Sequence, residues 1–405
     1  MKVLFDARSV FQGMGGIGRA TAALAREIPR QLGAGDELLI LRTKGGHARA
    51  PLQEVGRART PQGHGNAPLH DGSNPAVQEL ECEGAMIDPC FEQAVLPGLL
   101  EEHRVDLFHG TCFAVPVAPS TVAKVATVHD VVFRRHPELV DPRLADALDR
   151  ATAIACSTAD RIVTVSNHAR GEIAALYGRD RGVVVVPNGV AESFLGVERR
   201  APPDAPFILY VGSLERKKNV PALLRGFAAL LRRAPELPHQ LVLVGGAGGQ
   251  AFDLEAALAE VGDARERVHV LGHVPEPTLH ALYAAADAFV YLSAYEGFGL
   301  PPLEAMAAGV PTLVADRSSL PEVVGGAALR VNADDADEVS AALQRLLVDR
   351  ELRATLAREG RERAALFRWE TSARLLVELY REVLAERDGA SAAPALRVLS
   401  GGKRA

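Results

Sequence analysis

The 405-residue sequence predicts an α/β protein made of two doubly wound domains, each with a parallel β-sheet. Three observations support this fold class. The chain is too long for one ordinary hydrophobic core. Short apolar strands alternate with helical stretches. The alternation stops in a Pro- and charge-rich segment, residues 188–206, and then starts again. We therefore expect a ligand cleft between the domains, at the carboxyl ends of the strands.

The first domain is expected to span residues 1–190. Helical patterns cover residues 19–28 and 142–159, whereas residues 44–78 are rich in Gly, Pro, His, Ala and Asn and predict a long loop. Its strands are expected at KVLF, ELLILR, DLFHG, AKVATVHD, RIVTVS and GVVVVPNG.

The second domain is expected to span residues 191–370, with helices at 219–234 and 277–286 and a helical pattern from 335 to 387. We expect residues 371–388 to form a helix that packs back on the first domain. The small and polar residues 389–405 predict a disordered tail. The strands of this domain are expected at FILYVGS, QLVLVGG, RVHVLG, AFVYLS, PTLVA and ALRV.

The composition is that of a globular protein, with 48% hydrophobic and 24% charged residues. The net charge of −6 gives no electrostatic case for nucleic acid. The basic pairs at 134–135, 199–200 and 232–233 predict solvated faces, with a lipid-headgroup patch as the alternative.

The N-terminus has no signal-peptide pattern, and no run approaches 18 apolar residues. We therefore expect a cytoplasmic protein, with peripheral contact at the inner face of the membrane left open. The four cysteines fit neither a zinc pattern nor a disulfide scaffold, which predicts reduced and mostly buried thiols.

A glycine-rich loop at residues 13–18 reads Gly-Met-Gly-Gly-Ile-Gly, the G-x-G-x-x-G pattern of dinucleotide-binding folds. In that fold the first glycine follows the first strand directly. Here six residues separate Asp6 from Gly13. The second strand ends on Arg42, which leaves an NADP site open. The loop also precedes a helix, and free N–H groups at a helix N-terminus favour any anion.

The stretch YLSAYEGFGLPPLEAMAAGVPTLVA, residues 291–315, carries two acids after a predicted strand. Glu296 comes before a Gly-Pro-rich turn, and Glu304 lies just inside the following helix. Free N–H groups near Gly299 and Leu300 can bind a phosphate. A carboxylate at the position of Glu304 can accept hydrogen bonds from ribose hydroxyls. The alternatives are a helix-dipole partner for Glu304 and a solvated loop acid for Glu296.

A basic cluster follows another predicted strand in YVGSLERKKNV, residues 210–220. Arg216, Lys217 and Lys218 stand between the carboxyl end of the strand and the next helix, where cations can hold a diphosphate. The alternative is a solvated basic loop.

With these motifs the chain resembles the retaining glycosyltransferases of family 4. Glu296 and Glu304 in EGFGLPPLEAMAAG are similar to the E-x7-E signature of that family. The segments ALYAAADAFVYLS, SSLPEVVGGAAL, VVPNGV, VATVHD and FRWETSA also match, so the resemblance covers most of the chain. It implies the GT-B fold, with two Rossmann-like domains and the donor in the cleft: an acceptor-side first domain and a nucleotide-sugar-binding second domain.

The resemblance implies a role for each matching residue. Glu304 would bind the ribose hydroxyls of the nucleotide and Glu296 the hydroxyls of the donor sugar. Gly299 and Leu300 would offer backbone N–H groups to phosphate and sugar, in a loop that also holds Phe298. Lys218 matches the lysine that neutralises the diphosphate leaving group.

The position that often holds an arginine in this family is Ser213 here. This departure leaves the second phosphate ligand open between Lys217 and Arg216. His273 and Val274 match a strand end whose backbone frames the base.

In the first domain, His129 matches a histidine near the donor sugar and the reaction centre, and a structural histidine is the alternative. The glycine loop resembles that of the family, with Gly15 and Gly16 as the backbone candidates for the donor diphosphate or the acceptor. We take His129, Glu296 and Lys218 as the catalytic candidates.

The resemblance implies transfer of a hexose from a nucleoside diphosphate sugar, with GDP-mannose as the first candidate, to a glycan or lipid-linked glycan in envelope polysaccharide synthesis. Neither a cofactor nor a metal is expected. The D-x-D at Asp335 and Asp337 could suggest a metal site, but it starts a helical segment, where acids act as caps. The alternatives are an NAD(P) oxidoreductase that uses Gly13, Gly15 and Gly18, a nucleotide-sugar epimerase, a sugar phosphorylase, and a noncatalytic nucleotide-sugar-binding subunit.

Overall fold

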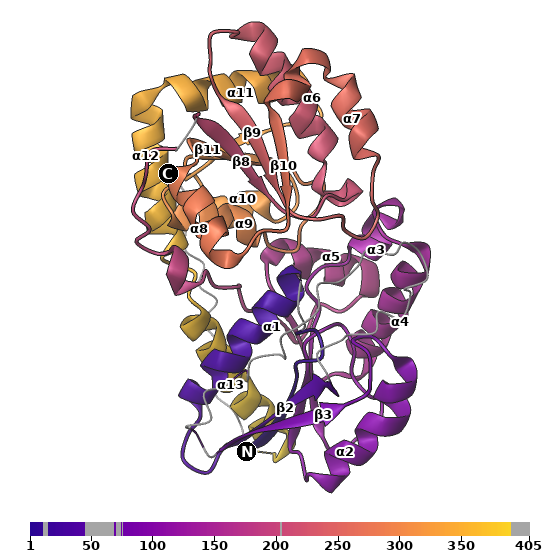
Figure 1. Cartoon of the computed structure of the whole chain (residues 1–405). Coiled ribbons are helices and arrows are strands. Elements are labelled where there is room, and N and C mark those ends of the chain that lie inside the picture. Colours follow the sequence, from indigo (N-terminus) through magenta and orange to yellow (C-terminus); the bar gives the residue numbers. More distant parts are fainter. Residues whose placement is uncertain (11–14, 45–68, 70–73, 75, 203–204, 390–405) are drawn as a thin grey trace. The chain divides into compact units, whose positions relative to one another are not determined.

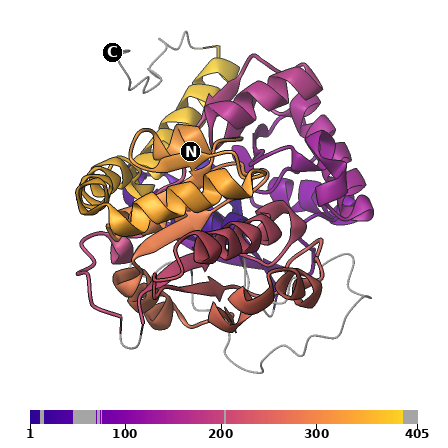
Figure 2. The same cartoon turned by 90° about the horizontal axis from the view of Figure 1, so that it is seen from above.

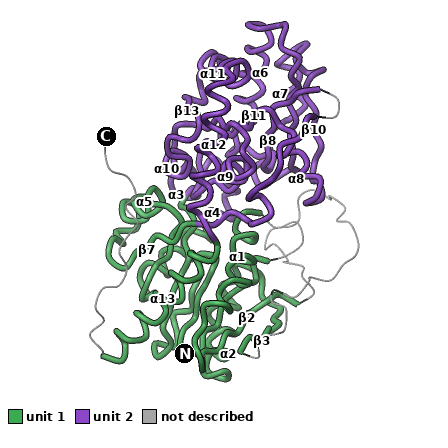
Figure 3. Tube along the Cα trace, turned by 90° about the vertical axis from the view of Figure 1, so that its left-hand side faces the viewer, with its two compact units in different colours: residues 1–131, 146–187, 369–405 green, residues 132–145, 188–368 purple. Residues whose placement is uncertain are grey.

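The computed structural model describes residues 1–10, 15–44, 69, 74, 76–202 and 205–389. The chain forms two compact units (Figure 3). Unit 1 contains residues 1–131, 146–187 and the chain from 369 on, and unit 2 contains residues 132–145 and 188–368. Most of the expected 44–78 loop and the expected tail after Gly389 lie outside the described residues.

Unit 1 contains a seven-stranded parallel sheet in the order β3-β2-β1-β4-β5-β6-β7. All six strands predicted for this half of the sequence are present. The strands are β1 (Lys2–Asp6), β2 (Glu37–Thr43), β3 (Val77–Cys82), β4 (Leu107–Gly110), β5 (Ala123–Thr127), β6 (Arg161–Thr164) and β7 (Val183–Val185).

Strand β3 corrects the sequence analysis, which predicted six strands here and extended the loop to residue 78. The segment VQELEC has two glutamates and a glutamine, so its apolar signal is weak. Polar residues are tolerated because β3 is an edge strand that pairs with β2 alone. Glu79 on β3 forms an ion pair of 2.6 Å with the buried Arg42. Arg42 is therefore engaged within the sheet, at the position where the dinucleotide hypothesis needed a ligand for a 2′-phosphate.

The last helix of the described chain, α13, contributes to the main core of unit 1. Helix α13 packs against α1, η1 and β5, and its residues Leu376, Val377 and Tyr380 belong to the main core of the unit. The Tyr380 hydroxyl lies 2.6 Å from His109 Nδ1, and burial lowers the pKa of His109 to about 3. The helices are α1 (Gly16–Glu27), η1 (Ile28–Gln31), η3 (Phe91–Val95), α2 (Leu96–Glu102), α4 (Pro142–Thr158), whose residues 142–145 belong to unit 2, α5 (Asn167–Tyr177) and α13 (Trp369–Arg387).

Unit 2 contains a parallel sheet of six strands, the number that the sequence predicted, in the order β10-β9-β8-β11-β12-β13. Figure 1 labels β8 to β11 of this sheet. The four inner strands are almost wholly buried, which explains their uninterrupted apolar sequences. The strands are β8 (Phe207–Val211), β9 (Gln240–Val244), β10 (Val268–Gly272), β11 (Ala288–Tyr291), β12 (Thr312–Ala315) and β13 (Leu329–Val331).

Helices of unit 2 pack in pairs over this sheet. Helix α11 lies along α6, and α12 lies along α9 (Figures 1 and 2). The α6–α11 contact depends on Gly226, because a Cβ there would lie 2.3 Å from Val339 Cγ1. The helices are α3 (Val132–Arg135), η4 (Pro137–Leu139), η5 (Glu192–Phe194), η6 (Arg216–Lys218), α6 (Val220–Arg233), α7 (Leu254–Glu260), η7 (Gly262–Arg267), α8 (Glu276–Ala285), α9 (Leu300–Ala307), α10 (Leu320–Val324), α11 (Ala336–Val348) and α12 (Arg350–Ala364).

The strand order of each sheet reverses once, between β1 and β4 in unit 1 and between β8 and β11 in unit 2. In open α/β sheets the loops at the carboxyl ends of such a strand pair diverge and leave a ligand-binding crevice. The loop after β8 carries the basic cluster of residues 216–218, and the loop after β11 carries Glu296. The sheet topology thus brings together two motifs that are about 80 residues apart in the sequence.

No helix among the described residues is long and apolar enough to cross a membrane. All four cysteines are described and free, and only Cys90 is exposed.

Candidate active site

Lys218 and Glu296 form a buried ion pair at the reversal point of the unit 2 sheet. The Lys218 ammonium lies 2.6 Å from Glu296 Oε1, and the two side chains are only 12% and 10% exposed. Lys218 ends the short turn η6 after β8, and Glu296 follows β11. Backbone contacts tie the two loops together, since Ala294 N donates to Lys217 O at 2.8 Å.

Three donors converge on the same oxygen of Glu296. Besides Lys218, the hydroxyls of Tyr291 and Ser293 lie 2.9 and 2.6 Å from Oε1. Within the described part of the chain the second oxygen, Oε2, accepts no hydrogen bond. The protein therefore fixes the carboxylate through one oxygen and leaves the other for a ligand.

Burial and charge act in opposite directions on this pair. Burial raises the pKa of Glu296, but Lys218, then Lys217, and the hydrogen bonds from Lys218 and Ser293 outweigh it and hold the pKa below its ordinary value. Burial lowers the pKa of Lys218, but Glu296 and Glu215 outweigh it and raise the pKa. Both groups are therefore charged at neutral pH.

The loop after Glu296 is held by serine side chains. Glu296 N donates to Ser318 Oγ at 3.0 Å, and Ser319 Oγ donates to the carbonyls of Glu296 and Phe298 at 2.9 and 2.8 Å. Phe298 is 5% exposed and contacts Phe367 edge to face. Phe298 therefore helps to hold the loop by packing.

Gly299 begins helix α9 with φ +113°, a conformation that favours glycine. The prolines at positions 301 and 302 have no N–H groups, so the first turn keeps the N–H of Leu300 as a donor beside that of Gly299. This helix N-terminus directs free N–H groups and the positive end of the dipole to one point.

Glu304 lies one turn into α9 and is 1% exposed. The hydroxyl of Tyr283, on α8, donates to Glu304 Oε2 at 3.1 Å. Glu304 is thus a buried carboxylate beside a tyrosine hydroxyl, and ionised carboxylate oxygens are acceptors for hydroxyl groups.

The three cations of η6 differ in their surroundings. Lys218 is buried against Glu296, Lys217 is half-buried and close enough to lower the pKa of Glu296, and Arg216 is exposed. Ser213, at the family's arginine position, donates to Glu215 Oε1 at 2.9 Å. His273 is exposed and Val274 half-buried, and both follow the edge strand β10, two strands from β8.

His129 belongs to unit 1, beyond the carboxyl end of β5. Its Nε2 lies 2.8 Å from the carbonyl oxygen of Thr111, which can only accept, so Nε2 carries the proton and Nδ1 is the acceptor atom. Burial lowers the pKa of His129, against the opposing effects of Thr111 and Asp130. The neutral ring can therefore accept one hydrogen bond from a ligand hydroxyl.

Gly15 is the N-cap of α1, and Gly16 is its first residue. A Cβ added at either position would meet no atom within 4 Å, so packing inside the protein does not require glycine there. Gly13, which the dinucleotide pattern also needs, lies outside the described residues.

The D-x-D segment has a structural role. Asp335 is the N-cap of α11 and accepts hydrogen bonds from the N–H groups of Asp337 and Glu338, each at 3.0 Å. Over the described residues, no group of His, Cys, Asp and Glu side chains is arranged to hold a metal ion.

Sequence reasoning missed Tyr291, Ser293 and Tyr283. Tyr291 is the last residue of β11 and Ser293 lies two residues beyond it, and two hydroxyl side chains just before Glu296 were a usable signal. Tyr283 gave no comparable signal, because a tyrosine among alanines on a helix is typical of a packing residue.

The two sheets and this site define a glycosyltransferase of the GT-B fold. The family described as "Glycosyl transferases group 1" matches residues 197–363, and the family described as "Glycosyltransferase Family 4" matches residues 14–194. The chain belongs to glycosyltransferase family 4, and the resemblance stated from the sequence is confirmed. This membership overturns the oxidoreductase and epimerase alternatives.

Curated relatives and solved structures agree with this assignment. The chain is 32% identical to O-antigen chain mannosyltransferase B from Escherichia coli over 70% of this chain and 76% of that protein. It is 35% identical to D-inositol 3-phosphate glycosyltransferase from Corynebacterium urealyticum over 50% of this chain and 51% of that protein. Sucrose-phosphate synthase from Thermosynechococcus elongatus has a TM-score of 0.71 at 21% identity, over 95% of this chain and 100% of that one. WaaG, a glycosyltransferase involved in lipopolysaccharide biosynthesis, has a TM-score of 0.67 at 16% identity, over 93% and 99%.

Proposed function

We propose that this enzyme is a retaining glycosyltransferase that transfers a hexosyl group from a nucleoside diphosphate sugar to a glycan or lipid-linked glycan. The observation that carries the proposal is the arrangement of Lys218, Glu296 and Glu304 at the reversal point of the unit 2 sheet. Cations follow β8, Glu296 follows β11, and Glu304 lies in α9, whose N-terminus begins where the loop after β11 ends. Cations, a helix N-terminus and carboxylates are the groups that can bind the diphosphate and the hydroxyls of a sugar nucleotide.

Each part of the donor has a candidate partner. The buried Glu304 accepts hydrogen bonds from the ribose hydroxyls, while Tyr283 holds its other oxygen. The N–H groups of Gly299 and Leu300 donate to the diphosphate. Oε2 of Glu296 accepts a hydroxyl of the sugar, while Oε1 stays with its three donors.

Stabilisation of the leaving group drives the chemical step. When the bond between the anomeric carbon and the β-phosphate oxygen breaks, negative charge accumulates on that phosphate. Lys218, with Lys217 as the second cation, stabilises this charge. We choose Lys217 over Arg216 because Lys217 acts on the charge of Glu296 and Arg216 is exposed. These cations supply the charge that a metal would bring, so we propose that the reaction needs none.

The relatives favour a mannosyl donor. Two E. coli relatives, O-antigen chain mannosyltransferase B and the serotype-specific mannosyltransferase WbdA, carry mannosyl transfer in their names. GDP-mannose is therefore the first donor to test, and O-antigen-like envelope polysaccharide is the first acceptor class. We propose a retaining reaction in which the acceptor attacks on the face that the phosphate leaves. The roles of His129, Gly15, Gly16, His273 and Val274 remain predictions from the family resemblance.

Thermal shift with a nucleotide-sugar panel in EDTA tests this function. A bound donor raises the unfolding midpoint, and a concentration of 100 Kd stabilises the protein by about 2.7 kcal/mol. We expect GDP-mannose to raise the midpoint of the wild type, and Glu304→Gln and Lys218→Met to lose the shift. Glu276→Gln, an exposed acid in the first turn of α8, is the matched control.

A transfer assay then separates an enzyme from a noncatalytic binding subunit. The anomeric configuration of the product, read by NMR, distinguishes retention from inversion. A stabilising shift by NADPH alone, or a donor shift that survives both site variants, would overturn the proposed donor site.

A further inference from the structure

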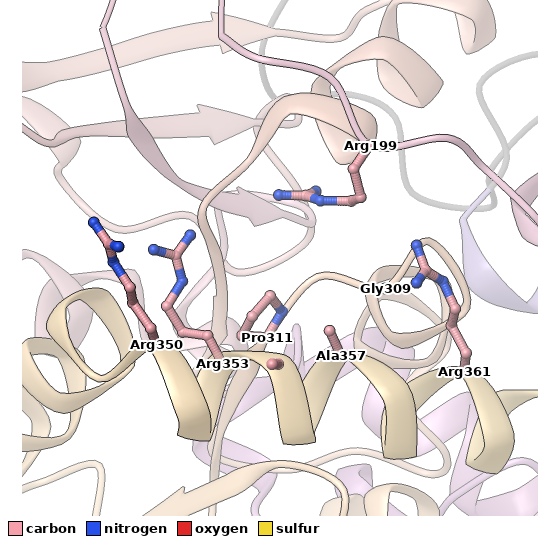
Figure 4. Close-up of a pocket in the computed structure, with 8 residues that line it drawn as sticks. Arg199, Gly309, Pro311, Arg350, Arg353, Ala357 and Arg361 are labelled. Atoms are coloured by element: carbon pink, nitrogen blue, oxygen red, sulfur yellow. The ribbon is translucent and has the colours of Figure 1, made fainter.

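A second basic site lies on unit 2, at the end of the sheet opposite to the candidate active site. A pocket of about 350 Å³ is lined by the arginines at positions 199, 350, 353 and 361 (Figure 4). Pro311, also in its wall, immediately precedes β12, so the pocket lies at the amino ends of the strands. Lys218 and Glu296 follow the carboxyl ends, so this pocket is separate from the donor site.

Helix α12 presents three of the four arginines on one face. Positions 350, 353, 357 and 361 recur at helical spacing, and Figure 4 shows these side chains along the same side of the helix. Ala354 and Ala357 are small, which leaves room between the long side chains. Arg199 reaches in from the segment before β8 and completes the pocket from the other side.

The positive charge of the pocket is only partly neutralised. Arg353 is paired with Asp287 at 2.8 Å. Arg199 donates to the carbonyls of Tyr283 and Ala286, which carry no net charge. Burial lowers the pKa of Arg199, and Arg353 and Arg361 lower it further against the attraction of Asp287.

The two remaining guanidinium groups have most of their donors available. Arg361 makes a long hydrogen bond of 3.4 Å to Ala308 O. Arg350 is exposed, and within the described part of the chain its side chain makes no hydrogen bond or ion pair. A guanidinium has five N–H donors, so the pocket offers many more donors than the protein uses.

The backbone accommodates this arrangement. Gly309 has φ +70°, and a Cβ there would lie 2.3 Å from Arg361 Cζ. Glycine is therefore required for the Arg361 guanidinium to lie against the turn between α9 and β12. The glycine thus leaves room for this guanidinium beside the turn.

We propose that this arginine pocket binds a phosphate-bearing ligand. Guanidinium groups bind phosphate oxygens through paired hydrogen bonds, and a ring of them favours a multiply charged anion. The volume accommodates a diphosphate or a phosphate that carries a further group. Two sources share this chemistry, a free phosphate compound and the headgroup of an anionic lipid. The inference does not depend on the proposed donor specificity.

Calorimetric titration with inorganic pyrophosphate, at low salt and with EDTA, tests for a free ligand. We expect wild-type binding that weakens about tenfold in Arg350→Glu and several-fold in Arg350→Gln, because a charge-assisted contact is lost. Arg232→Glu is the matched control, since Arg232 is exposed near the end of α6 and lies outside the pocket. Pyrophosphate also mimics the donor diphosphate. Each titration is therefore repeated with Lys218→Met, where the effect of Arg350→Glu should persist.

Vesicle sedimentation tests the lipid source, with phosphatidylglycerol vesicles against phosphatidylcholine vesicles. Binding to phosphatidylglycerol that is lost in Arg350→Glu and kept in Arg232→Glu assigns the headgroup as the ligand. Pyrophosphate binding alone assigns a free phosphate compound. The proposal is overturned if neither probe binds, if Arg350→Glu behaves like Arg232→Glu with both probes, or if Lys218→Met abolishes all pyrophosphate binding and phosphatidylglycerol vesicles do not bind either. A nucleotide-sugar panel without any hit would overturn the donor proposal and leave this one standing.

Discussion

Removal of Lys218 tests the most consequential contact of the site, because it leaves the carboxylate of Glu296 buried without its main counter-charge. Breaking a buried ion pair by removing one partner costs about 3–5 kcal/mol. We expect Lys218→Met to lie at the low end, about 3 kcal/mol, since the hydroxyls of Tyr291 and Ser293 still bond to Oε1. For a unit of this size the thermal midpoint should fall by about 6–12 °C.

The loss of stability in Lys218→Met should depend on pH in a definite direction. In the wild type the pKa of Glu296 is lowered by folding, so the pair contributes stability above the unfolded pKa and loses it as the pH falls through the folded value. In Lys218→Met, burial is no longer opposed by Lys218, and the folded pKa rises above the unfolded one. The deficit should therefore be largest at neutral pH and shrink as the pH falls and Glu296 takes up a proton.

Urea unfolding between pH 4.5 and 8 measures both effects. Lys217→Met is the control, because Lys217 is half-buried and makes no ion pair among the described residues. We expect it to cost less than about 1 kcal/mol. The double variant Lys218→Met/Glu296→Gln should recover much of the lost stability. A cost for Lys218→Met below about 1 kcal/mol at pH 7, or a deficit that does not change with pH, would refute the reasoning.

Three further substitutions test other contacts. Tyr283→Phe removes the hydroxyl that donates a hydrogen bond to Glu304 Oε2, so the Kd of the nucleotide sugar should rise by about tenfold in calorimetry. An unchanged Kd would contradict a positioning role for Tyr283. Gly226→Ala places a Cβ 2.3 Å from Val339 Cγ1 and should cost about 1–3 kcal/mol in urea unfolding, a loss that Val339→Ala should reduce. Tyr380→Phe leaves a buried histidine nitrogen without its hydroxyl partner and should cost about 1–3 kcal/mol in the same assay.

The predictable part of the fold is the part with a strong apolar signal. Twelve of the thirteen strands follow from apolar runs, because parallel strands buried on both faces consist mainly of apolar residues. Strand β3 was not predicted because its sequence is too polar. It is an edge strand, where glutamates can be solvated or, like Glu79, can pair with Arg42. Residues 132–145 belong to unit 2, although the residues on both sides of them in the sequence belong to unit 1. No sequence pattern predicts this assignment, because it depends on contacts with residues distant in the sequence.

The residues of the candidate site likewise include some that the sequence predicts and others that it does not. Glu296, Glu304 and Lys218 were predictable because glycines, prolines and charges mark loops after apolar strands. The supporting hydroxyl of Tyr283 was not, since an aromatic residue in a core segment normally contributes packing alone, whereas the spacing of Tyr291 and Ser293 was a signal that the sequence analysis did not use. The arginine pocket joins position 199 to residues 350–361, and only the packed structure shows that these segments meet.

The ion pair of Lys218 and Glu296 raises the question of how one lysine can serve both a carboxylate and a phosphate. An ammonium group has three N–H donors, and Glu296 takes one of them at 2.6 Å. The other two remain available for oxygens of the diphosphate. Tyr291 and Ser293 also donate hydrogen bonds to Oε1. Glu296 therefore stays ionised when Lys218 interacts with a phosphate as well as with the carboxylate. Glu296 therefore acts on the donor in two ways, through Oε2 toward the sugar and through Oε1 as the group that positions Lys218. Loss of its charge should weaken the binding of a bare nucleoside diphosphate as well as that of the full sugar nucleotide, whereas a residue that contacts only the sugar would leave the former unchanged.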